Sequence, residues 1–555
     1  MTPSSDRVSS CMITASEPVG RGEPVKIRTS GGSIPISPFV STLGIPAVSM
    51  TGPQVGIVTE SAHGRARILE VRTDRLRSRL SEGQVVVVAG FQGTSQSSGG
   101  TAEITTLGRG GSDTSAVALA AALGADACEI YTDVPGVLTT DPRKVADAQL
   151  MQQVSCDEML ELASLGAAVL HPRAVEIARN YGVTLVVRSS WSDEPGTTLT
   201  SRNARPIGRE GLELGRPVDG TDLVEHQAVL ALSHVPDQPG VAAQLFEALS
   251  ADGVNVDLII QATHEGSSND ITFTVAEADL SKARGICAGL LDRWGGQLVA
   301  EGGMSKLSIS GAGIMGRPGI AAGLFDTLSR AGINLRLIAT SEVKVSCVID
   351  AEFGGKALRA VSQAFELDEH QVHLNPPASG EGEPEVRGIA LDRDQAQVSV
   401  RHVPNKPGTA ATLCTTLADA GISLDAIVQS EREHADGSRD ISFTLKRDDR
   451  TRADQALAPL LAQWPGAVLE DGPAIARVSA VGAGMPATAG TAGRMFRYLA
   501  DAGLNIEMIA TSEIRTSCVV AETDGIAALK AVHDGFGLGG STLHQAQGTE
   551  SPLEV

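Results

Sequence analysis

Aromatic residues are scarce in this sequence, because Phe, Trp and Tyr together make up 3% of its 555 residues. Ala, Val, Leu and Ile must therefore fill the cores, which is typical of α/β layers in which β-branched strands pack beneath Ala- and Leu-rich helices. The chain is 42% hydrophobic and 20% charged, which excludes a wholly disordered protein. At about 150 residues per domain, the length indicates three to four domains.

Basic residues, paired cysteines and long apolar runs are also lacking. Lys and Arg number 45 against 66 Asp and Glu, and the net charge of −21 argues against non-specific nucleic-acid binding. The seven cysteines form no CxxC motif and no His/Cys cluster, which favours reduced thiols in the cytoplasm and predicts no metal site. Every apolar run is far shorter than a membrane span, and the N-terminus does not read as a secretory signal, so no membrane contact is expected.

Residues 43–200 alternate between strand-like and helix-like segments, which predicts a largely parallel α/β sheet. Residues 1–42 are rich in Ser, Pro, Gly and Thr and are expected to be loop or disordered. The strand-like segments are Ile45–Ser49, Val85–Ala89, Cys128–Tyr131 and Thr184–Val187; the helix-like segments are Ala66–Leu80, Ser115–Leu123, Cys156–Ser164 and Ala174–Tyr181.

The remainder of the chain is an internal repeat. The motif HVPDQPG at His234 recurs as HVPNKPG at His402, and a second motif, which begins at Gly311, recurs at Gly482. Each unit reads as strand, Gly/Pro turn, amphipathic helix, Gly-Asx turn and strands, a βαββαβ pattern of ferredoxin-like type. The expected modules are 227–300 (module 1), 304–366 (module 2), 395–470 (module 3) and 474–540 (module 4), with linkers at 201–226 and 367–394.

The sharpest local motif is TTLGRGGSDT at 105–114, which precedes an Ala-rich helix. Its glycines let the backbone approach a ligand, and a helix N-terminus attracts anions. Arg109, expected to be buried, adds bidentate geometry for a carboxylate or phosphate. A tight strand–helix turn capped by Ser112, Asp113 or Thr114 is the alternative interpretation.

A second motif, YTDVPGVLTTDPR at 131–143, begins at the end of a predicted strand, where ligands bind in open α/β sheets. Asp133 and Asp141 could accept from a ribose or a metal-bound water, and Arg143 could meet a phosphate. Taken alone, the motif could equally be a loop with Asx caps.

Together these motifs, with SMTGPQVGIVTE, VVVVAGFQG, LGAAVLHPRAVEIARNYGV and VVRSSW, resemble the aspartokinases of the amino-acid kinase family, and the repeats resemble ACT modules. The resemblance implies an α/β protein with a truncated amino-acid kinase-type sheet sandwiched by helices, followed by four ferredoxin-like ACT modules. It implies a phosphotransferase that uses ATP with Mg²⁺ to convert L-aspartate into 4-phospho-L-aspartate, the first step toward lysine, threonine and methionine.

The resemblance places Arg109, Gly111 and Ser112 at the substrate aspartate, and Thr132, Asp133, Asp141 and Arg143 at the nucleotide; it assigns no catalytic residue. The sequence departs from the family pattern, because it lacks the Lys-Phe-Gly-Gly-Thr-Ser strand and has Ala168 where a lysine is common. The first part of the kinase domain is therefore expected to be missing or replaced, and the chain alone is expected to have little activity. The alternative is a catalytically impaired regulatory subunit that pairs with an intact kinase chain.

The repeats predict amino-acid pockets of their own. A carboxylate could bind the helix starts after Gly240 and Gly408, and the ligand's ammonium could meet Asp237 or its counterpart Asn405. Gln261 and Gln429 follow on strands, and Asn334 and Asn505 lie in Gly-Asx turns. Because each pair of consecutive modules has one Gln and one such Asn, Gln261 is expected to act with Asn334 and Gln429 with Asn505. By resemblance, modules pair across subunits of a homodimer and bind lysine or threonine.

Overall fold

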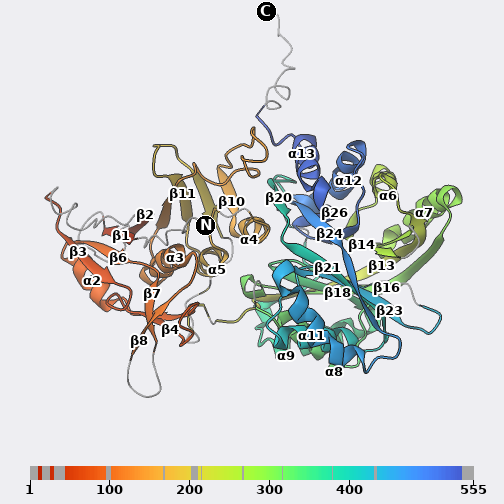
Figure 1. Cartoon of the computed structure of the whole chain (residues 1–555), viewed down its shortest axis with the longest axis horizontal. Helices are drawn as coiled ribbons and strands as arrows, with labels where there is room; N and C mark the ends of the chain where they lie inside the picture. The colour runs from red at the N-terminus through yellow and green to blue at the C-terminus, as the bar shows by residue number, and fades with distance from the viewer. Residues whose placement is uncertain are drawn as a thin grey trace, which may run out of the picture. The chain divides into compact units, whose positions relative to one another are not determined.

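The computed structural model describes residues 10–15, 25–30, 44–95, 102–166, 169–201, 205, 211–213, 215–264, 268–314, 317–377, 379–429 and 434–540. The chain divides into two compact units (Figure 1). The first comprises residues up to Leu138 and Leu150–Pro217. The second comprises Thr139–Gln149 and the chain from Val218 onward, so a short piece of the predicted kinase region belongs to the repeat region.

The first unit contains a mixed eight-stranded sheet in the order β10-β12-β11-β9-β2-β1-β6-β3. Strand β9 runs parallel to β2 and β11, β3 runs parallel to β6, and β1 runs antiparallel to both of its neighbours. A four-stranded sheet, β5-β4-β7-β8, lies in the same unit. The strands are β1 (Ser10–Ala15), β2 (Val25–Ser30), β3 (Ala47–Thr51), β4 (Ile57–Thr59), β5 (Ile68–Val71), β6 (Val85–Ala89), β7 (Gln92–Ser95), β8 (Glu103–Thr106), β9 (Ala127–Thr132), β10 (Gln153–Ser155), β11 (Leu185–Ser189) and β12 (Thr197–Thr200).

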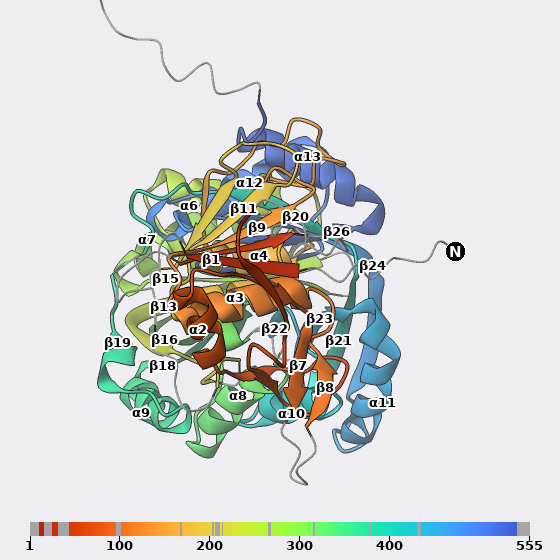
Figure 2. The same ribbon diagram turned by 90° about the vertical axis from the view of Figure 1, so that its left-hand side faces the viewer.

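The helices among the described residues of this unit are α2 (Asp74–Ser81), α3 (Gly111–Leu123), α4 (Cys156–Ser164) and α5 (Pro172–Tyr181). Helix α3 is apolar around most of its circumference, and it packs on β1, β2 and β9 on one side and on α5 on another. Figure 2 shows α3 beside β1 and β9, and Figure 1 shows it beside α5. The expectation of one helix over Ala66–Leu80 is wrong in its first half, where β5 pairs with β4 before α2 begins. Ile68 is buried there, and its amide is bonded by Glu213, a long-range contact that no local pattern reveals.

Residues 1–42 contain two strands, which differs from the loop or disorder expected there. Strand β1 pairs with β2 over six residues, and β2 continues the sheet by pairing in parallel with β9. Both strands are short and lie between Ser-, Pro- and Gly-rich segments, so the average composition of the region predicts loop. The ladder formed with distant strands decides their structure instead.

The second unit contains a fourteen-stranded sheet that runs through all four modules. Its strands are β13 (Gly220–Pro236), β14 (Val256–His264), β15 (Ser268–Ala276), β16 (Gln297–Ser310), β17 (Leu337–Thr340), β18 (Lys344–Asp350), β19 (Val372–Leu374), β20 (Gly388–Asp392), β21 (Gln395–Val403), β22 (Ile427–Gln429), β23 (Arg439–Lys446), β24 (Val468–Val481), β25 (Met508–Ser512) and β26 (Arg515–Ala521). Its helices are α6 (Val241–Ala251), α7 (Leu280–Trp294), α8 (Ile320–Arg330), α9 (Gly354–Ala364), α10 (Thr409–Asp419), α11 (Arg450–Leu461), α12 (Thr491–Asp501) and α13 (Gly525–Gly535).

Long strands connect consecutive modules, so the segments expected as linkers are partly structured. The first residues of β13, Gly220–Val224, pair with the end of β16 in module 2, whereas the rest of β13 pairs with β15 and with the start of β16 in module 1. Module 1 is thus inserted within the sheet of module 2. Strand β20 likewise pairs with β24 of module 4 before β21 enters module 3. The expected linkers 201–226 and 367–394 therefore contain the first strands of modules 2 and 4.

The modules pair non-consecutively, and they do so within one chain. Strand β14 of module 1 pairs with β25 of module 4, and helices α6 and α12 pack together. One apolar core joins modules 1 and 4, and another joins modules 2 and 3, where α8 packs on α10. The expected pairing across subunits is corrected accordingly: each module has its partner in the same polypeptide.

The segment Thr139–Gln149 is held by module 4. The Thr139 carbonyl accepts from the Ile389 amide at 2.8 Å, and its hydroxyl lies 3.0 Å from Nε2 of the buried His533. Val145 is part of the core that joins modules 1 and 4. Asp141 and Arg143, two predicted nucleotide residues, are therefore carried by a segment that is anchored in the repeat region.

Candidate functional site

The loop before α3 has the backbone that an anion site needs. Gly108 and Gly110 adopt positive φ angles of 81° and 68°, and Gly110 is the N-cap of α3. A Cβ at Gly110 would lie 2.3 Å from the His171 ring, and one at Gly111 would lie 2.9 Å from Leu107 Cβ, so glycine is required at both positions. The N-cap is a glycine, and Ser112, Asp113 and Thr114 lie inside the helix, so none of them is the N-cap residue expected from the sequence. The Gly111 amide donates to the Gly108 carbonyl at 3.0 Å, whereas the amides of Ser112 and Asp113 have no main-chain acceptor among the described residues and are left to bind an anion.

Arg109 projects from this loop and is exposed, which differs from the buried position expected of it. Gly111 and Ser112 begin the helix directly behind it, with Ser112 half-buried. The structure therefore brings the three predicted substrate residues together at one helix start. A guanidinium beside the unbonded amides of Ser112 and Asp113 is suited to a carboxylate.

Asp113 lies in the first turn of the same helix. Burial raises the pKa of its carboxyl to about 6, although the main-chain amide of His171 opposes this shift by donating to it. His171 caps α5, where its Nδ1 accepts from the Arg173 amide at 3.3 Å. Burial, followed by the nearby Arg173, lowers the pKa of His171, so a neutral imidazole covers Gly110.

Sequence reasoning missed Arg173, which holds the loop in place. Its guanidinium donates to the Leu107 carbonyl at 2.5 Å, to the Ala66 carbonyl at 2.9 Å and to Glu213 at 2.7 and 2.8 Å. The Glu213 side chain is 2% exposed, so the pair is shielded from water. Only the His-Pro-Arg sequence at the start of a helix hinted at this role, and it does not reveal the acceptor 40 residues away.

Thr132 and Asp133 lie where β9 ends, as the motif predicts. The Thr132 hydroxyl donates to Asp133 at 3.1 Å. Strand β2 ends beside β9, because Ser30 is paired in parallel with Tyr131. Both strands therefore deliver their carboxyl ends to one edge of the sheet, the usual place for a ligand.

Asp141 and Arg143 bind each other instead of standing free. Arg143 donates to Asp141 at 2.9 and 3.1 Å, and Lys144 is 3.2 Å away. These contacts, foremost the Arg143 hydrogen bond, lower the pKa of Asp141 to about 2. The two residues belong to the second unit and Asp133 to the first, so the structure does not bring all four predicted nucleotide residues into one unit. Ala168 lies outside the described residues.

The first amino-acid pocket is formed by modules 1 and 4. Gly240 starts helix α6 with a φ of 93°, and Gln261 donates to the Ile506 carbonyl at 2.8 Å. Asp237 accepts from Asn505 at 2.8 Å and from Asn269 at 2.9 Å. A pocket opens between these groups.

The second pocket repeats this arrangement in modules 2 and 3. Gly408 starts helix α10 with a φ of 96°, and Asn405 accepts from Asn334 at 3.3 Å. Gln429 lines the pocket with both of these side chains. The expected grouping is therefore wrong: Asn505 belongs with Asp237 and Gln261, and Asn334 belongs with Asn405 and Gln429.

Comparisons with known proteins match both units. The model of the amino acid kinase family matches residues 36–189, one ACT domain model matches 233–288, 307–365 and 478–536, and a second matches 396–463. None of the helices among the described residues is long and apolar enough to cross a membrane.

The similar proteins are named as aspartokinases or aspartate kinases. An aspartokinase of Thermus thermophilus is 46% identical over 328 residues, which cover 59% of this chain and 78% of that protein. An aspartokinase of Bacillus sp. (strain MGA3) is 44% identical over 347 residues, covering 61% and 81%. A solved aspartate kinase from Synechocystis matches with a TM-score of 0.79 and 50% identity, covering 93% of this chain and 86% of that one. The chain belongs to the aspartokinase family, with an amino acid kinase domain followed by ACT domains.

Proposed function

We propose that the first unit transfers the γ-phosphoryl group of ATP to the side-chain carboxylate of L-aspartate, giving 4-phospho-L-aspartate and ADP. The observation that carries this proposal is the start of helix α3, where the unbonded amides of Ser112 and Asp113 stand together with the exposed Arg109. The kinase-named relatives support an enzyme over a regulatory subunit, because their likeness extends over most of their own length.

In this proposal Arg109 and the amide of Ser112 hold a carboxylate of the substrate, and Gly111, which has no side chain, lets the substrate approach the helix start. Thr132 and Asp133, at the end of β9, face the nucleotide; a nucleotide role for Asp141 and Arg143, which belong to the other unit, stays a prediction from the sequence. Phosphoryl transfer needs positioning and charge neutralisation more than covalent chemistry from the protein. Mg²⁺ would supply part of that neutralisation, and Asp133 offers a hard oxygen ligand of the kind it prefers.

The test is an aspartyl-hydroxamate assay on the full chain and on Arg109→Ala. Losing a charged bidentate contact costs about 2–3 kcal/mol, so kcat/KM for aspartate should fall roughly 30- to 150-fold, with a higher KM. Arg75→Ala is the matched control, because Arg75 is also exposed but lies on α2. Equal kcat/KM values for the Arg109 variant and the wild type would contradict the assignment. The low activity expected from the sequence changes only the wild-type value against which the variants are compared; no ATP-dependent hydroxamate at all from the wild type would contradict the activity itself.

We further propose that lysine or threonine binds the two pockets and regulates the kinase. Each pocket offers a glycine-started helix for the ligand carboxylate and an Asp or Asn acceptor for its ammonium. A ligand that binds only the folded state stabilises it by about 2.7 kcal/mol at 100 times its Kd. Thermal unfolding should therefore shift upward with either amino acid. Calorimetry should show that Gln261→Ala weakens one class of site and Gln429→Ala the other; failure of both amino acids to bind would exclude this role.

A homodimer formed through the ACT modules remains a prediction. Val299 on β16 and Val468 on β24 are 54% and 52% exposed, and these apolar side chains on the corresponding strands of the two repeats support a protein contact there. Light scattering after size-exclusion chromatography would give the mass directly.

A cytoplasmic location is proposed because six cysteines in the described part of the chain are buried free thiols.

A further inference from the structure

A cluster of three side chains in the second unit can bind a metal ion and has no role in the proposals above. Asp147, in the segment Thr139–Gln149, lies beside His533 and Asp534, which are neighbours in the last turn of α13. Each residue offers one ligand atom, and these atoms all lie within 4.8 Å of one another. Sequence spacing gives no sign of the cluster, because its members come from distant parts of the chain.

His533 is the buried member of the cluster, and one of its ring nitrogens has no partner. Its side chain is 0% exposed, and Nδ1 makes no hydrogen bond among the described residues. Nearly every buried polar atom in a folded protein is satisfied, so an orphaned nitrogen points to a bound water or ion. The Asp534 carboxylate lies 3.7 Å from Nδ1, which is too far for a hydrogen bond but near enough to share a ligand.

The other ring nitrogen, Nε2, decides which tautomer His533 adopts. The Thr139 hydroxyl lies 3.0 Å from Nε2, accepts from the Gln149 amide at 3.0 Å and donates its own proton to the Leu538 carbonyl at 3.3 Å. Because that proton is already used, Nε2–H donates to the hydroxyl, and Nδ1 carries the free lone pair. A histidine whose second nitrogen is held by such a hydrogen bond has the usual form of a metal ligand.

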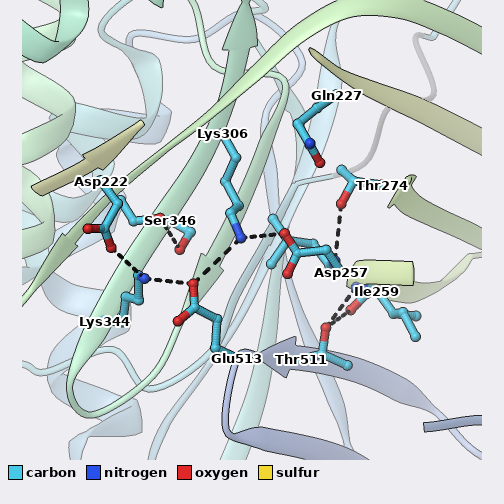
Figure 3. A network of polar contacts seen from close by, with 12 residues as sticks. Asp222, Gln227, Asp257, Ile259, Thr274, Lys306, Lys344, Ser346, Thr511 and Glu513 are labelled. Atoms are coloured by element: carbon cyan, nitrogen blue, oxygen red, sulfur yellow. Dashed lines mark hydrogen bonds and ion pairs between the residues drawn. The ribbon is translucent and has the colours of Figure 1, made fainter. Parts of the chain in front are cut away.

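The two carboxylates of the cluster have no basic partner to balance them, unlike those of another acidic cluster in the unit. In the network of Figure 3 each carboxylate binds a lysine: Asp222 and Glu513 bind Lys344, and Asp257 binds Lys306. Within the described part of the chain, neither Asp147 nor Asp534 has a lysine or arginine partner. A cation that balances them therefore comes from solution.

The main chain brings Asp147 to the end of α13. The Gly540 amide donates to the Asp147 carbonyl at 3.2 Å, and the neighbouring Ala148 forms an antiparallel bridge with Gly539. Glycine is required at 539 for this approach, since a Cβ there would lie 2.1 Å from Oδ2 of Asp147. The C-terminal end of a helix carries a partial negative charge, so the place itself favours a cation.

We propose that Asp147, His533 and Asp534 bind a divalent transition metal ion, zinc in particular, which joins the segment Thr139–Gln149 to helix α13. Zinc takes imidazole nitrogen and carboxylate oxygen at about 2.0–2.2 Å, and two such ligands of a tetrahedral ion lie roughly 3.4 Å apart. The Asp534 oxygen is already close to that separation from Nδ1, and the exposed Asp147 side chain can turn toward the ion. Water completes the shell. Magnesium is disfavoured, because it prefers oxygen ligands to imidazole.

The test is isothermal titration calorimetry of the full chain with zinc chloride in a buffer with excess Mg²⁺, which fills sites that consist of oxygen ligands alone. Asp147→Asn and Asp534→Asn each remove one charged ligand from the surface and should leave the fold intact. His533→Gln places an amide near the position of Nε2, so it keeps the contact with Thr139 and loses the Nδ1 ligand. Asp419→Asn is the matched control, because Asp419 is also exposed and ends a helix, α10, but lies outside the cluster.

We expect Zn²⁺ to bind one site per chain with a Kd of about 10 μM or tighter, and each cluster variant should weaken that site at least tenfold. Asp419→Asn should leave it within twofold of the wild type. In crystals grown with zinc, an anomalous difference map at the zinc edge should place the ion about 2.0–2.1 Å from Nδ1 of His533. The two aspartate variants and this map decide if His533→Gln does not fold. Absence of zinc binding, a zinc site that no cluster variant weakens, or a map with no ion at Nδ1 would overturn the proposal.

Discussion

Replacing Asn505 by alanine distinguishes the observed pairing of modules from the consecutive pairing that the repeat order suggests. Asn505 lies in module 4, yet its amide donates at 2.8 Å to Asp237 of module 1. The variant should therefore weaken the class of amino-acid site that Gln261→Ala weakens. Asn334→Ala is the matched change in module 2, and it should act with Gln429→Ala.

The magnitude follows from the contacts of the Asp237 carboxylate. It accepts from two amides, those of Asn505 and Asn269, and the variant removes one. A hydrogen bond to a charged group contributes about 1.5–3 kcal/mol. Because part of that energy holds the carboxylate in position for the ligand's ammonium, we expect affinity to fall roughly 10- to 100-fold.

Calorimetry with lysine and with threonine measures both classes of site in one chain. A double-mutant cycle of Asn505→Ala with Asp237→Ala should be strongly non-additive, since each change removes the same contact. If Asn505→Ala instead weakens the class that depends on Gln429, the pairing of module 1 with module 4 is refuted. Equal loss from both classes would refute the separation of the pockets.

Three further outcomes are expected. Burial raises the pKa of Asp113 from 3.8 to about 6 in the folded state. The free energy of unfolding therefore falls as the pH rises between these values, because the carboxyl ionises more readily in the unfolded chain. Asp113→Asn should thus stabilise the chain above pH 6 by at most about 3 kcal/mol and progressively less toward pH 4, and a flat difference in chemical denaturation across that range would contradict this. Arg173→Met should destabilise the first unit by roughly 3–5 kcal/mol, because it removes the guanidinium that pairs with the buried Glu213 carboxylate. Amide hydrogen exchange near Leu107 should become faster, since Arg173 also binds the Leu107 carbonyl. Cleavage at a protease site inserted within 206–210 should leave the two fragments associated on size-exclusion chromatography, since Thr139–Gln149 stays packed in the second unit; their separation would show that this anchor is weak.

The sequence predicted features that depend on local pattern. The segment Val85–Ala89 is a strand with the predicted bounds, and Cys156–Ser164 is a helix with the predicted bounds. The amino acid kinase and ACT assignment is confirmed, because the motifs that carry it are long and specific. Arg109, Gly111 and Ser112 lie at one helix start because they are neighbours in the chain, and their role at the substrate stays a prediction.

Features that depend on distant contacts were not predictable. Repeat order alone cannot say which modules pair, because consecutive and crossed pairings bury the same apolar faces. The exposure of Arg109 depends on how Gly108 and Gly110 turn the backbone. Strand β2 was hidden because its partner in the ladder, β9, lies far along the chain.

The crossed pairing of modules has a consequence for how the duplication can evolve. Each pocket takes one half from each repeat: Asp237 and Asn334 come from the first, and Asn505 and Asn405 come from the second. Neither repeat contains a complete pocket, so substitutions that accumulate in either repeat alter both pockets. Because both halves are covalently joined, their effective concentration is fixed by the chain and not by the amount of protein in the cell. Effector binding should then have the same affinity in dilute and in concentrated solutions, which a pocket shared between separate subunits would not guarantee.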